Sequence, residues 1–406
     1  MTFELTNSQR LFLGLEPIES TWEKVVLKGD TYRPESILYF DGDIIKRHIV
    51  STENQYKESQ YDDLTRSRVA LLPATTKGKE KKLTASVLES RQPIGVYCLI
   101  ETNERICIGN YNTQTTFYDS LWENYKSSEI IPISALVENF IRTCEDGYLS
   151  DINQFKNSKR KNIKFRPGDF FTFKINRTEY GFGRILLNID EIKKRNLIPK
   201  YHGLSFLMGK PVLIKVYAYI SSSKDINIEE LEKTSALPSD YMMDNLFFYD
   251  EYKIIGRKDL KSEDLDFPMS YGRHISATKQ SIFLQWGLIH LELPVTYFNK
   301  YLVAENPFAP EGSPSRKSTN PYGYYGMGFR PTYGTTDVKD AIENVGAYNF
   351  LNHLKFKGNF DLRNPRNKEI RAEIMRAFGL DPIKNYDENC DLTNTIDSKK
   401  LLKIIA

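Results

Sequence analysis

The chain has 406 residues, of which 40% are hydrophobic and 13% aromatic. That length is enough for two or three domains, and the surplus of Tyr and Phe favours sheets over helical bundles. The formal charge of only +3 excludes a strong overall attraction to nucleic acid or anionic lipid, so any such binding must be local.

Residues 1–155 predict an α+β domain. We expect short helical or irregular pieces at LFLGLEPI (residues 11–18) and TWEKVVLKG (residues 21–29). The Asp41-Gly42 pair inside SILYFDGDIIKRHIV is a tight-turn signal, so this stretch predicts a hairpin. Apolar residues at steps of three and four between Ile133 and Cys144 predict an amphipathic helix that covers a sheet face.

Two of the four cysteines lie in strand-like runs, GVYCLI and RICIGN. If these runs form a hairpin across residues 101–104, Cys98 falls opposite Cys107 and a cross-strand disulfide is conceivable. Two buried thiols are the favoured alternative, because the cytoplasm is reducing. The cysteines show no C-x-x-C spacing, so we expect neither a disulfide scaffold nor a zinc knuckle.

Two short segments are rich in basic residues. Residues 77–82 carry Lys77, Lys79, Lys81 and Lys82, and residues 156–166 carry six Lys or Arg without an acid. We expect a solvated loop and a solvated linker, because such runs are commonly just exposed. The alternative is a grip on phosphate or on an acidic protein surface, and with it a nucleic-acid-binding or processing function. The near-neutral total charge disfavours nucleic acid as the partner.

Residues 163–300 predict a mostly antiparallel β domain, either a curved sheet or a small barrel. Its strand-like runs are FFTFKI, YGFGRILLNI, PVLIKVYAYI, EYKIIG and SIFLQWGLIHLELP, the last with Trp286. The polar gap at residues 176–179 has the length of a hairpin loop. Gly181 and Gly183 are two apart, so they leave one strand face bare, where a ring such as Phe171 or Phe173 can lie against the backbone.

Residues 301–336 predict a loop rich in Pro, Gly and Tyr, and residues 337–406 predict a helical extension. The loop is either an adaptable binding loop or a connector whose tyrosines fold back on the sheet. In the extension, apolar residues from Val338 to Leu351 indicate a first helix. Asn364 as cap and Pro365 in the first turn indicate a second helix, which ends before Gly379.

Sequence signals for catalysis are absent. The five histidines are scattered without metal-ligand spacing, and no nucleophile elbow or Walker-type loop occurs. The G-x-G at residues 181–183 lies inside a strand-like run, lacks a third glycine and opens no helix, so it does not predict a phosphate site. We therefore expect a protein without enzymatic activity, cofactor or metal. No apolar run has membrane-spanning length and residues 1–10 lack a signal layout, so we expect a cytoplasmic protein.

Several motifs in the middle of the chain share an order with one known family. Gly168-Asp169, the YGFGRIL run of residues 180–186, residues 210–216 and residues 253–260 followed by DFPMSYG resemble the immunity protein 26 family of bacterial polymorphic toxin systems. The resemblance spans about residues 163–293. It implies a mostly β binding protein that neutralises a cognate toxin through protein–protein contact, without known catalytic residues.

The family resemblance, together with charged and aromatic residues in predicted loops and hairpins, gives a set of candidate partner-binding and structural residues. Candidate partner-binding residues are Asp169, Glu179, Tyr322, Tyr324, Tyr325, Lys77 and Lys79. For Asp169 the alternative role is to cap the Gly168 turn by accepting from nearby backbone amides. The residues expected to maintain the structural motif are Gly168, Gly181, Gly183, Arg184 and Trp286.

Overall fold

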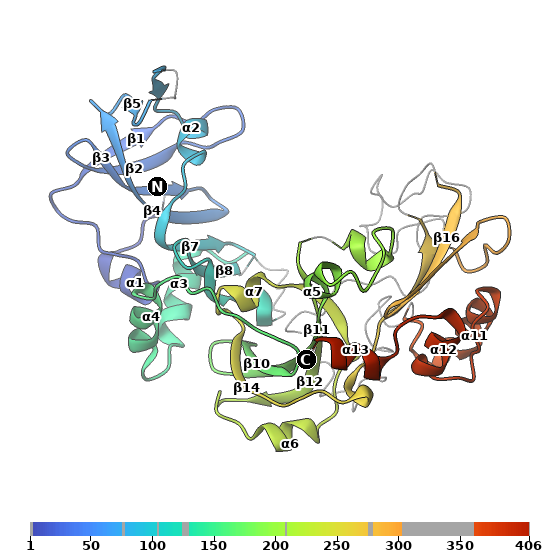
Figure 1. Cartoon of the computed structure of the whole chain (residues 1–406). Coiled ribbons are helices and arrows are strands. Elements are labelled where there is room, and N and C mark those ends of the chain that lie inside the picture. The colour runs from blue at the N-terminus through green and yellow to red at the C-terminus, as the bar shows by residue number, and fades with distance from the viewer. Residues whose placement is uncertain are drawn as a thin grey trace. The chain divides into compact units, whose positions relative to one another are not determined.

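The computed structural model describes residues 3–74, 78–103, 105–123, 130–207, 209–274, 279–302 and 361–405 (Figure 1). They form two compact units, the first made of Met1–Ile163 with Phe248–Glu251 and the second of Lys164–Phe247 with Tyr252–Ala406. The architecture is α+β with large antiparallel sheets, as predicted. The sheets are open, so the curved-sheet expectation is confirmed and the small-barrel alternative is wrong.

The first unit is built on a nine-stranded sheet whose main path runs β1-β2-β3-β4-β7-β8-β9, while β5 and β6 extend from β4. Neighbouring strands in it pair antiparallel. The strands are β1 Glu23–Leu27, β2 Ser36–Asp41, β3 Ile44–Ser51, β4 Gln55–Arg66, β5 Ala70–Leu71, β6 Lys81–Lys82, β7 Ile94–Glu101, β8 Arg105–Asn110 and β9 Thr115–Asp119.

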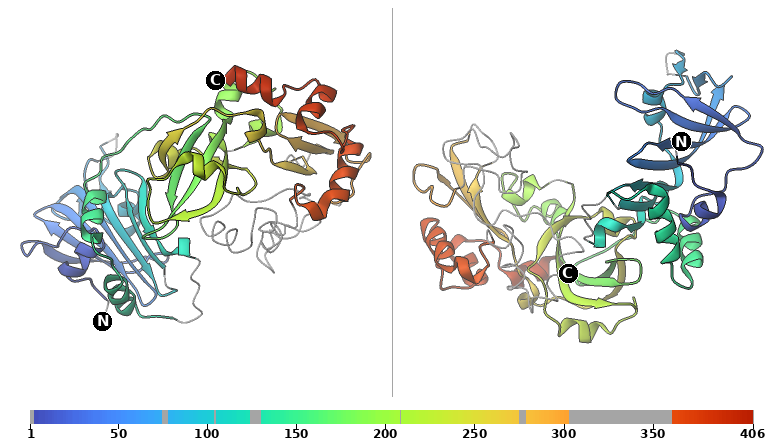
Figure 2. Two further views of the ribbon diagram at one scale, coloured as in Figure 1. Left: turned by 90° about the horizontal axis from the view of Figure 1, so that it is seen from below. Right: turned by 180° about the vertical axis from the view of Figure 1, so that it is seen from behind.

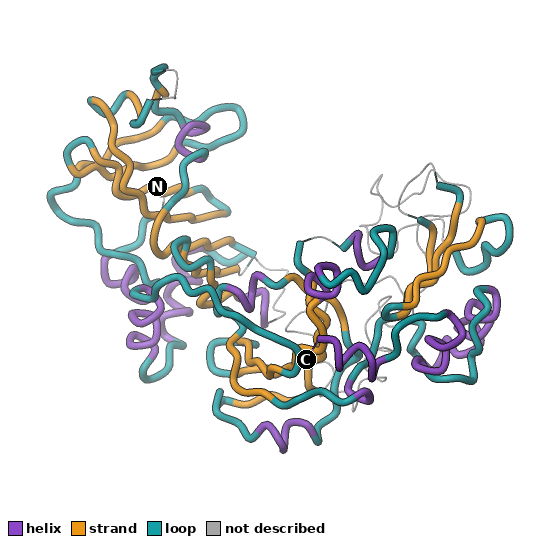
Figure 3. Tube along the Cα trace, in the orientation of Figure 1, coloured by secondary structure: helices purple, strands orange, loops and turns teal. Residues whose placement is uncertain are grey.

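One face of this sheet is covered by three helices, α1 Asn7–Phe12, α3 Ile133–Arg142 and α4 Tyr148–Lys156 (Figure 3). Leu136, Val137 and Phe140 of α3 pack in one core with strand residues such as Ile49 and Ile108. The predicted amphipathic helix is therefore confirmed. The helix α4, and the short helices α2 Ala85–Glu89 and η1 Ser120–Glu123, were not predicted.

Two expectations for the start of the chain have different outcomes. The Asp41-Gly42 hairpin is confirmed, since β2 and β3 pair across it and Gly42 has a φ of +57°. The expectation of a helical or irregular piece at residues 21–29 is wrong, because β1 pairs with β2 there and sets Val25 opposite Leu38. The β-branched Val25 and Val26 of β1 fit a pleated edge strand better than a helix.

The predicted hairpin of β7 and β8 forms, but its register differs by one residue from the expected one. Glu101 pairs with Arg105, so the loop is one residue shorter and Cys98 lies opposite Ile108. Because neighbouring strand residues point to opposite faces, Cys98 and Cys107 lie on different sides of the sheet. Both are free and buried, so the disulfide alternative is wrong and the two buried thiols are confirmed.

The second unit contains two sheets. The larger one runs β13-β12-β11-β10-β14 and the smaller one β15-β16-β17 (Figure 2). The strands are β10 Asp169–Lys174, β11 Tyr180–Asn188, β12 Pro211–Ser221, β13 Asp240–Met243, β14 Lys253–Arg257, β15 Met269–Arg273, β16 Ser281–Trp286 and β17 Ile289–Pro294. Residues 281–294 are thus two strands, not the single strand expected, because Gly287 turns the chain with a φ of +56°.

Short helices surround these sheets, namely α5 Ile189–Lys194, α6 Ile228–Glu232, α7 Asn245–Phe248, η2 Gly203–Phe206 and η3 Ser262–Asp264. Leu231 of α6 packs on Phe170, Phe182 and Tyr217 on one face of the larger sheet. The opposite face carries a second core, formed by residues such as Phe171, Phe173 and Phe247.

The described end of the chain, residues 361–405, is helical as expected, with η5 Pro365–Asn367, α11 Lys368–Ala377, α12 Tyr386–Thr393 and α13 Ser398–Ile405. Asn364 caps η5, the short 3-10 helix that leads directly into α11, by accepting from the Arg366 amide at 3.0 Å. Leu401 and Ile405 of α13 share a core with Ile189 and Ile192 of α5. The predicted loop at residues 303–336 and the predicted helix from Val338 to Leu351 lie outside the described residues. Within the described part, none of the helices combines the length and apolarity needed to cross a bilayer.

Candidate partner-binding site

The β10–β11 hairpin holds the glycines singled out in the sequence. Phe171 pairs with Gly183 and Phe173 with Gly181. A Cβ added at Gly181 would lie 2.5 Å from Phe173 Cζ, and one added at Gly183 would lie 2.7 Å from the Lys215 carbonyl oxygen and closer still to the Phe171 ring. The expected packing of phenyl rings on bare glycine backbone is therefore present, and the glycines shape a core.

Arg184, on the opposite face of β11 from this packing, is fully buried, with 0% of its surface exposed. Its guanidinium donates to Glu232 Oε1 at 2.9 Å and to the Lys258 carbonyl oxygen at 2.9 Å, and it lies 3.4 Å from Asp264 Oδ1. The guanidinium also sits over the Phe170 ring, 4.7 Å from its centroid. Arg184 thus ties β11 to α6, to the loop after β14 and to η3, which makes it a scaffold residue.

The Gly168-Asp169 turn is likewise built into the scaffold. Gly168 has a φ of +92°, and the nearby Lys258 carbonyl leaves no room for a side chain there. Asp169 is buried, and its Oδ2 accepts from the Arg166 amide at 2.9 Å. Burial raises the pKa of Asp169 above its usual value. The hydrogen bond from the Arg166 amide is the turn-capping contact considered for Asp169.

Aromatic and charged side chains that are half-buried or exposed lie at the loop end of the hairpin, and we call them the hairpin-end patch: Glu179, Tyr180, Tyr219 and Lys224. Tyr219 of β12 is 37% exposed and packs on the buried Phe182, with ring centroids 5.7 Å apart. Lys224 Nζ lies 5.0 Å from the centroid of the Tyr180 ring. Tyr219 is exposed and Tyr180 half-buried, and tyrosines that are partly open to solvent on a sheet are common in protein–protein interfaces.

The turn below this patch is held by local hydrogen bonds. Asn176 Oδ1 accepts from the amides of Thr178 and Glu179 at 2.9 and 2.8 Å, and Asn176 Nδ2 donates to Glu179 Oε2 at 2.5 Å. This Asx-type turn fixes the half-buried Glu179 at the rim of the patch. A preformed loop loses little conformational entropy on binding.

Glu179 is among the partner-binding residues predicted from the sequence, whereas Tyr180, Tyr219 and Lys224 are not. Their meeting depends on the pairing of β11 with β12, in which Tyr180 lies opposite Ser221. An irregularity between Gly181 and Gly183 shifts that register. The alternation of Tyr217 and Tyr219 on β12 was a signal that could have suggested the surface.

The other candidate residues lie apart from this patch. Lys79 is exposed in the first unit, near β6. Trp286 is half-buried in the smaller sheet and makes an edge contact with Tyr386, with ring centroids 5.1 Å apart, so it serves packing. Four candidate residues lie outside the described part of the chain, namely Lys77, Tyr322, Tyr324 and Tyr325.

Two lysines of the basic segment at residues 156–166 are paired with acids inside the first unit. Lys156 Nζ lies 2.8 Å from Glu16 Oε2, and Lys161 Nζ lies 2.7 Å from Asp250 Oδ2. Paired lysines of this kind contribute less to a phosphate-binding strip than free ones. Among the described residues no group of three His, Cys, Asp or Glu is arranged to hold a metal ion.

Neither a curated protein nor a solved structure matches the chain at a significant level. A family model does match, over residues 166–281, and its description is Immunity protein 26. The matched stretch begins at the Gly168 turn and ends at the start of β16, so it contains the whole larger sheet. The resemblance predicted from the motifs is thereby confirmed, and residues 166–281 of this chain are a match to the Immunity protein 26 family.

Proposed function

We propose that this chain is an immunity protein that binds a cognate bacterial toxin domain and blocks it by protein–protein association, without catalysing a reaction. The observation that carries the proposal is the match of residues 166–281 to Immunity protein 26. The roles of the motif residues agree with it, because Gly181, Gly183 and Arg184 serve packing and buried ion pairing.

The hairpin-end patch is the surface that we propose for the toxin. Tyr180 and Tyr219 offer apolar area at little entropic cost, and Lys224 and Glu179 give both signs of charge at the rim. Inhibition by a patch of this kind needs only that the bound protein cover the toxin's active site or its substrate groove. It needs no cofactor.

Co-expression in a bacterial host tests the function. The chain is expressed with the toxin encoded by the neighbouring reading frame, and cell survival and co-purification are measured. We expect survival and a stable complex. Death of the host despite folded, abundant chain would contradict the immunity function.

The patch is tested separately, by Tyr180→Thr and Tyr219→Thr, since threonine keeps a strand-favouring side chain. We expect each change to weaken toxin binding by about tenfold or more, as for interface tyrosines that act as hot spots. Tyr201→Thr is the matched control, because Tyr201 is 67% exposed but lies outside the patch. If the wild type protects and the patch variants bind as tightly as the control, the function holds and the surface is another one.

A further inference from the structure

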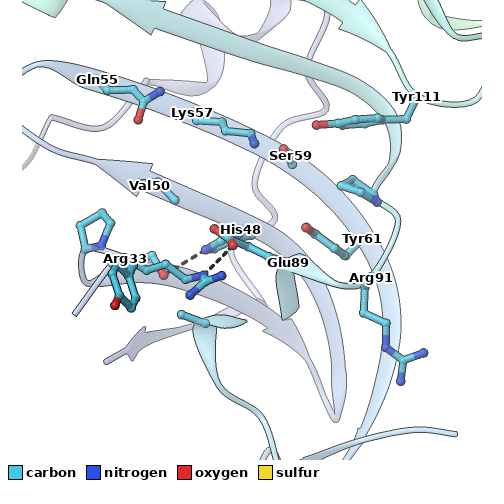
Figure 4. Close-up of a pocket in the computed structure, with 15 residues that line it drawn as sticks. Arg33, His48, Val50, Gln55, Lys57, Ser59, Tyr61, Glu89, Arg91 and Tyr111 are labelled. Atoms are coloured by element: carbon cyan, nitrogen blue, oxygen red, sulfur yellow. Dashed lines mark hydrogen bonds and ion pairs between the residues drawn. The ribbon is translucent and has the colours of Figure 1, made fainter. Parts of the chain in front are cut away.

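The first unit has a polar pocket on the sheet face opposite α1, α3 and α4. Its volume is about 400 Å³, within the range of small-molecule sites. Alternate residues of β4 line it, which are Gln55, Lys57, Ser59 and Tyr61, and Figure 4 shows Gln55, Lys57 and Ser59 following one another along the strand. His48 of β3 lies beside them, paired in register with Ser59.

Buried hydroxyl groups face this pocket without a protein partner. Ser59 is 3% and Tyr61 5% exposed, and neither side chain makes a hydrogen bond to another described residue. Hydroxyl groups that line a cavity and have no hydrogen bond to another described residue can bond to a ligand that enters it. His48 differs, because its Nε2 lies 2.9 Å from Ser36 Oγ and that hydrogen bond satisfies both groups.

Two of the cationic side chains that line the pocket, Arg33 and Arg91, have partners in the protein. Arg33 Nε pairs with Glu89 Oε2 at 2.5 Å, and Arg33 also pairs with Asp30. Arg91 donates to the Leu72 carbonyl oxygen at 2.9 Å and lies 4.0 Å from Asp63.

Lys57 has no acidic partner among the described residues, and its side chain is exposed. Burial, reinforced by the charge of Lys57, lowers the pKa of His48 to about 4, so His48 is neutral near pH 7. Among the described residues that line the pocket, Lys57 is therefore the charged side chain without a partner of opposite sign.

We propose that this pocket binds the anionic oxygen group of a small molecule, a carboxylate or a phosphate, with Lys57 as its counter-ion and the Ser59 and Tyr61 hydroxyls as hydrogen-bond donors. One ammonium and two hydroxyls on alternate residues of a single strand can converge on one anionic group. A charged acceptor makes stronger hydrogen bonds with these groups than water does. The site lies in the first unit, outside the residues that match the family, so this inference does not rest on the proposed immunity function.

The full chain is titrated with inorganic phosphate, acetate and adenosine monophosphate by calorimetry. We expect saturable binding of at least one probe, with a Kd that rises about tenfold or more in Lys57→Gln and less in Ser59→Ala. The probe that binds with the higher affinity, phosphate or acetate, identifies the anionic group that the pocket prefers. Lys28→Gln is the matched control, because Lys28 is also exposed and without a partner among the described residues, but does not line the pocket.

Histidine ring resonances in NMR locate the bound probe. The His48 signals should shift on titration, while those of His202, in the second unit, should not. Absence of saturable binding for all three probes would overturn the proposal. So would an equal loss of affinity in Lys28→Gln and Lys57→Gln, or a titration that leaves the His48 signals unchanged.

Discussion

The ring of Phe171 lies against the backbone of Gly183, its direct partner in the register of β10 and β11. No side chain fits between them, because a Cβ on Gly183 would also meet the Lys215 carbonyl oxygen at 2.7 Å. The hairpin of the matched segment therefore depends on the absence of a side chain at this position.

We expect Gly183→Ala to destabilise the second unit by about 1–3 kcal/mol, the usual cost of overpacking a core. Urea unfolding measures this free energy. The double variant Gly183→Ala with Phe171→Leu removes part of the overlap, so its loss should be smaller than the sum of the two single losses. Strictly additive losses would show that the ring does not press on Gly183.

Arg184→Met should cost about 3 kcal/mol in the free energy of unfolding, because it leaves the carboxylates of Glu232 and Asp264 without their buried partner. Lys258→Met is the control. Lys258 also pairs with Glu232 but is 44% exposed, so solvent screens the pair and the loss of stability should be much smaller than in Arg184→Met. Equal losses in the two variants would argue against a special role of the buried guanidinium.

His202 makes the stability depend on pH. Burial lowers the pKa of His202 to about 4. Its Nδ1 accepts from the Leu204 amide at 3.1 Å, while Nε2, which lies 2.9 Å from the Leu288 carbonyl oxygen, carries the proton. A second proton on Nδ1 would remove an acceptor that the fold uses, so the neutral ring is the folded form.

Between pH 6.5 and about 4, His202 is protonated in the unfolded chain but stays neutral in the folded protein. Stability should therefore fall as the pH is lowered through this window, by up to about 1.4 kcal/mol per pH unit for one proton. Urea unfolding between pH 7 and 4.5 should show a shallower slope in His202→Asn, whose amide oxygen can still accept from Leu204. If the free energy of unfolding depends on pH equally in the wild type and in His202→Asn, His202 is not a source of the pH dependence. The dependence that remains in His202→Asn should include the contribution of His48, whose pKa is also lowered.

Cys98 and Cys107 should stay reduced under mild oxidation, because they lie on opposite faces of the sheet. Burial raises the pKa of Cys107 to about 12, which removes the reactive thiolate. Alkylation followed by mass spectrometry should label both thiols only in denaturant, after the half-buried Cys144. A peptide that links Cys98 to Cys107 in the native protein would contradict the register.

The sequence predicted features that depend on near neighbours. The Asp41-Gly42 turn, the Asn364 cap and the glycines opposite Phe171 and Phe173 each act within a hairpin or a helix end. Such signals are local, so composition and spacing are sufficient to find them.

Features set by distant parts of the chain escaped prediction. Arg184 donates to Glu232 and to the Lys258 carbonyl oxygen, which lie 48 and 74 residues further along the chain. The sequence around Arg184 contains no signal that predicts either partner. Tyr219 packs on Phe182, and Tyr180 lies opposite Ser221, only through a shifted register between β11 and β12. The Cys98 prediction failed because one residue in a loop decides which face a side chain takes.

The contact between α13 and α5 bears on how this protein can be divided. The segment that matches the family ends at residue 281, yet Ile189 and Ile192 inside it share a core with Leu401 and Ile405 near the end of the chain. A fragment cut at residue 281 would open that core to water and invite aggregation. The smallest fragment that keeps this core intact is thus larger than the segment that matches the family, because it must also include α13.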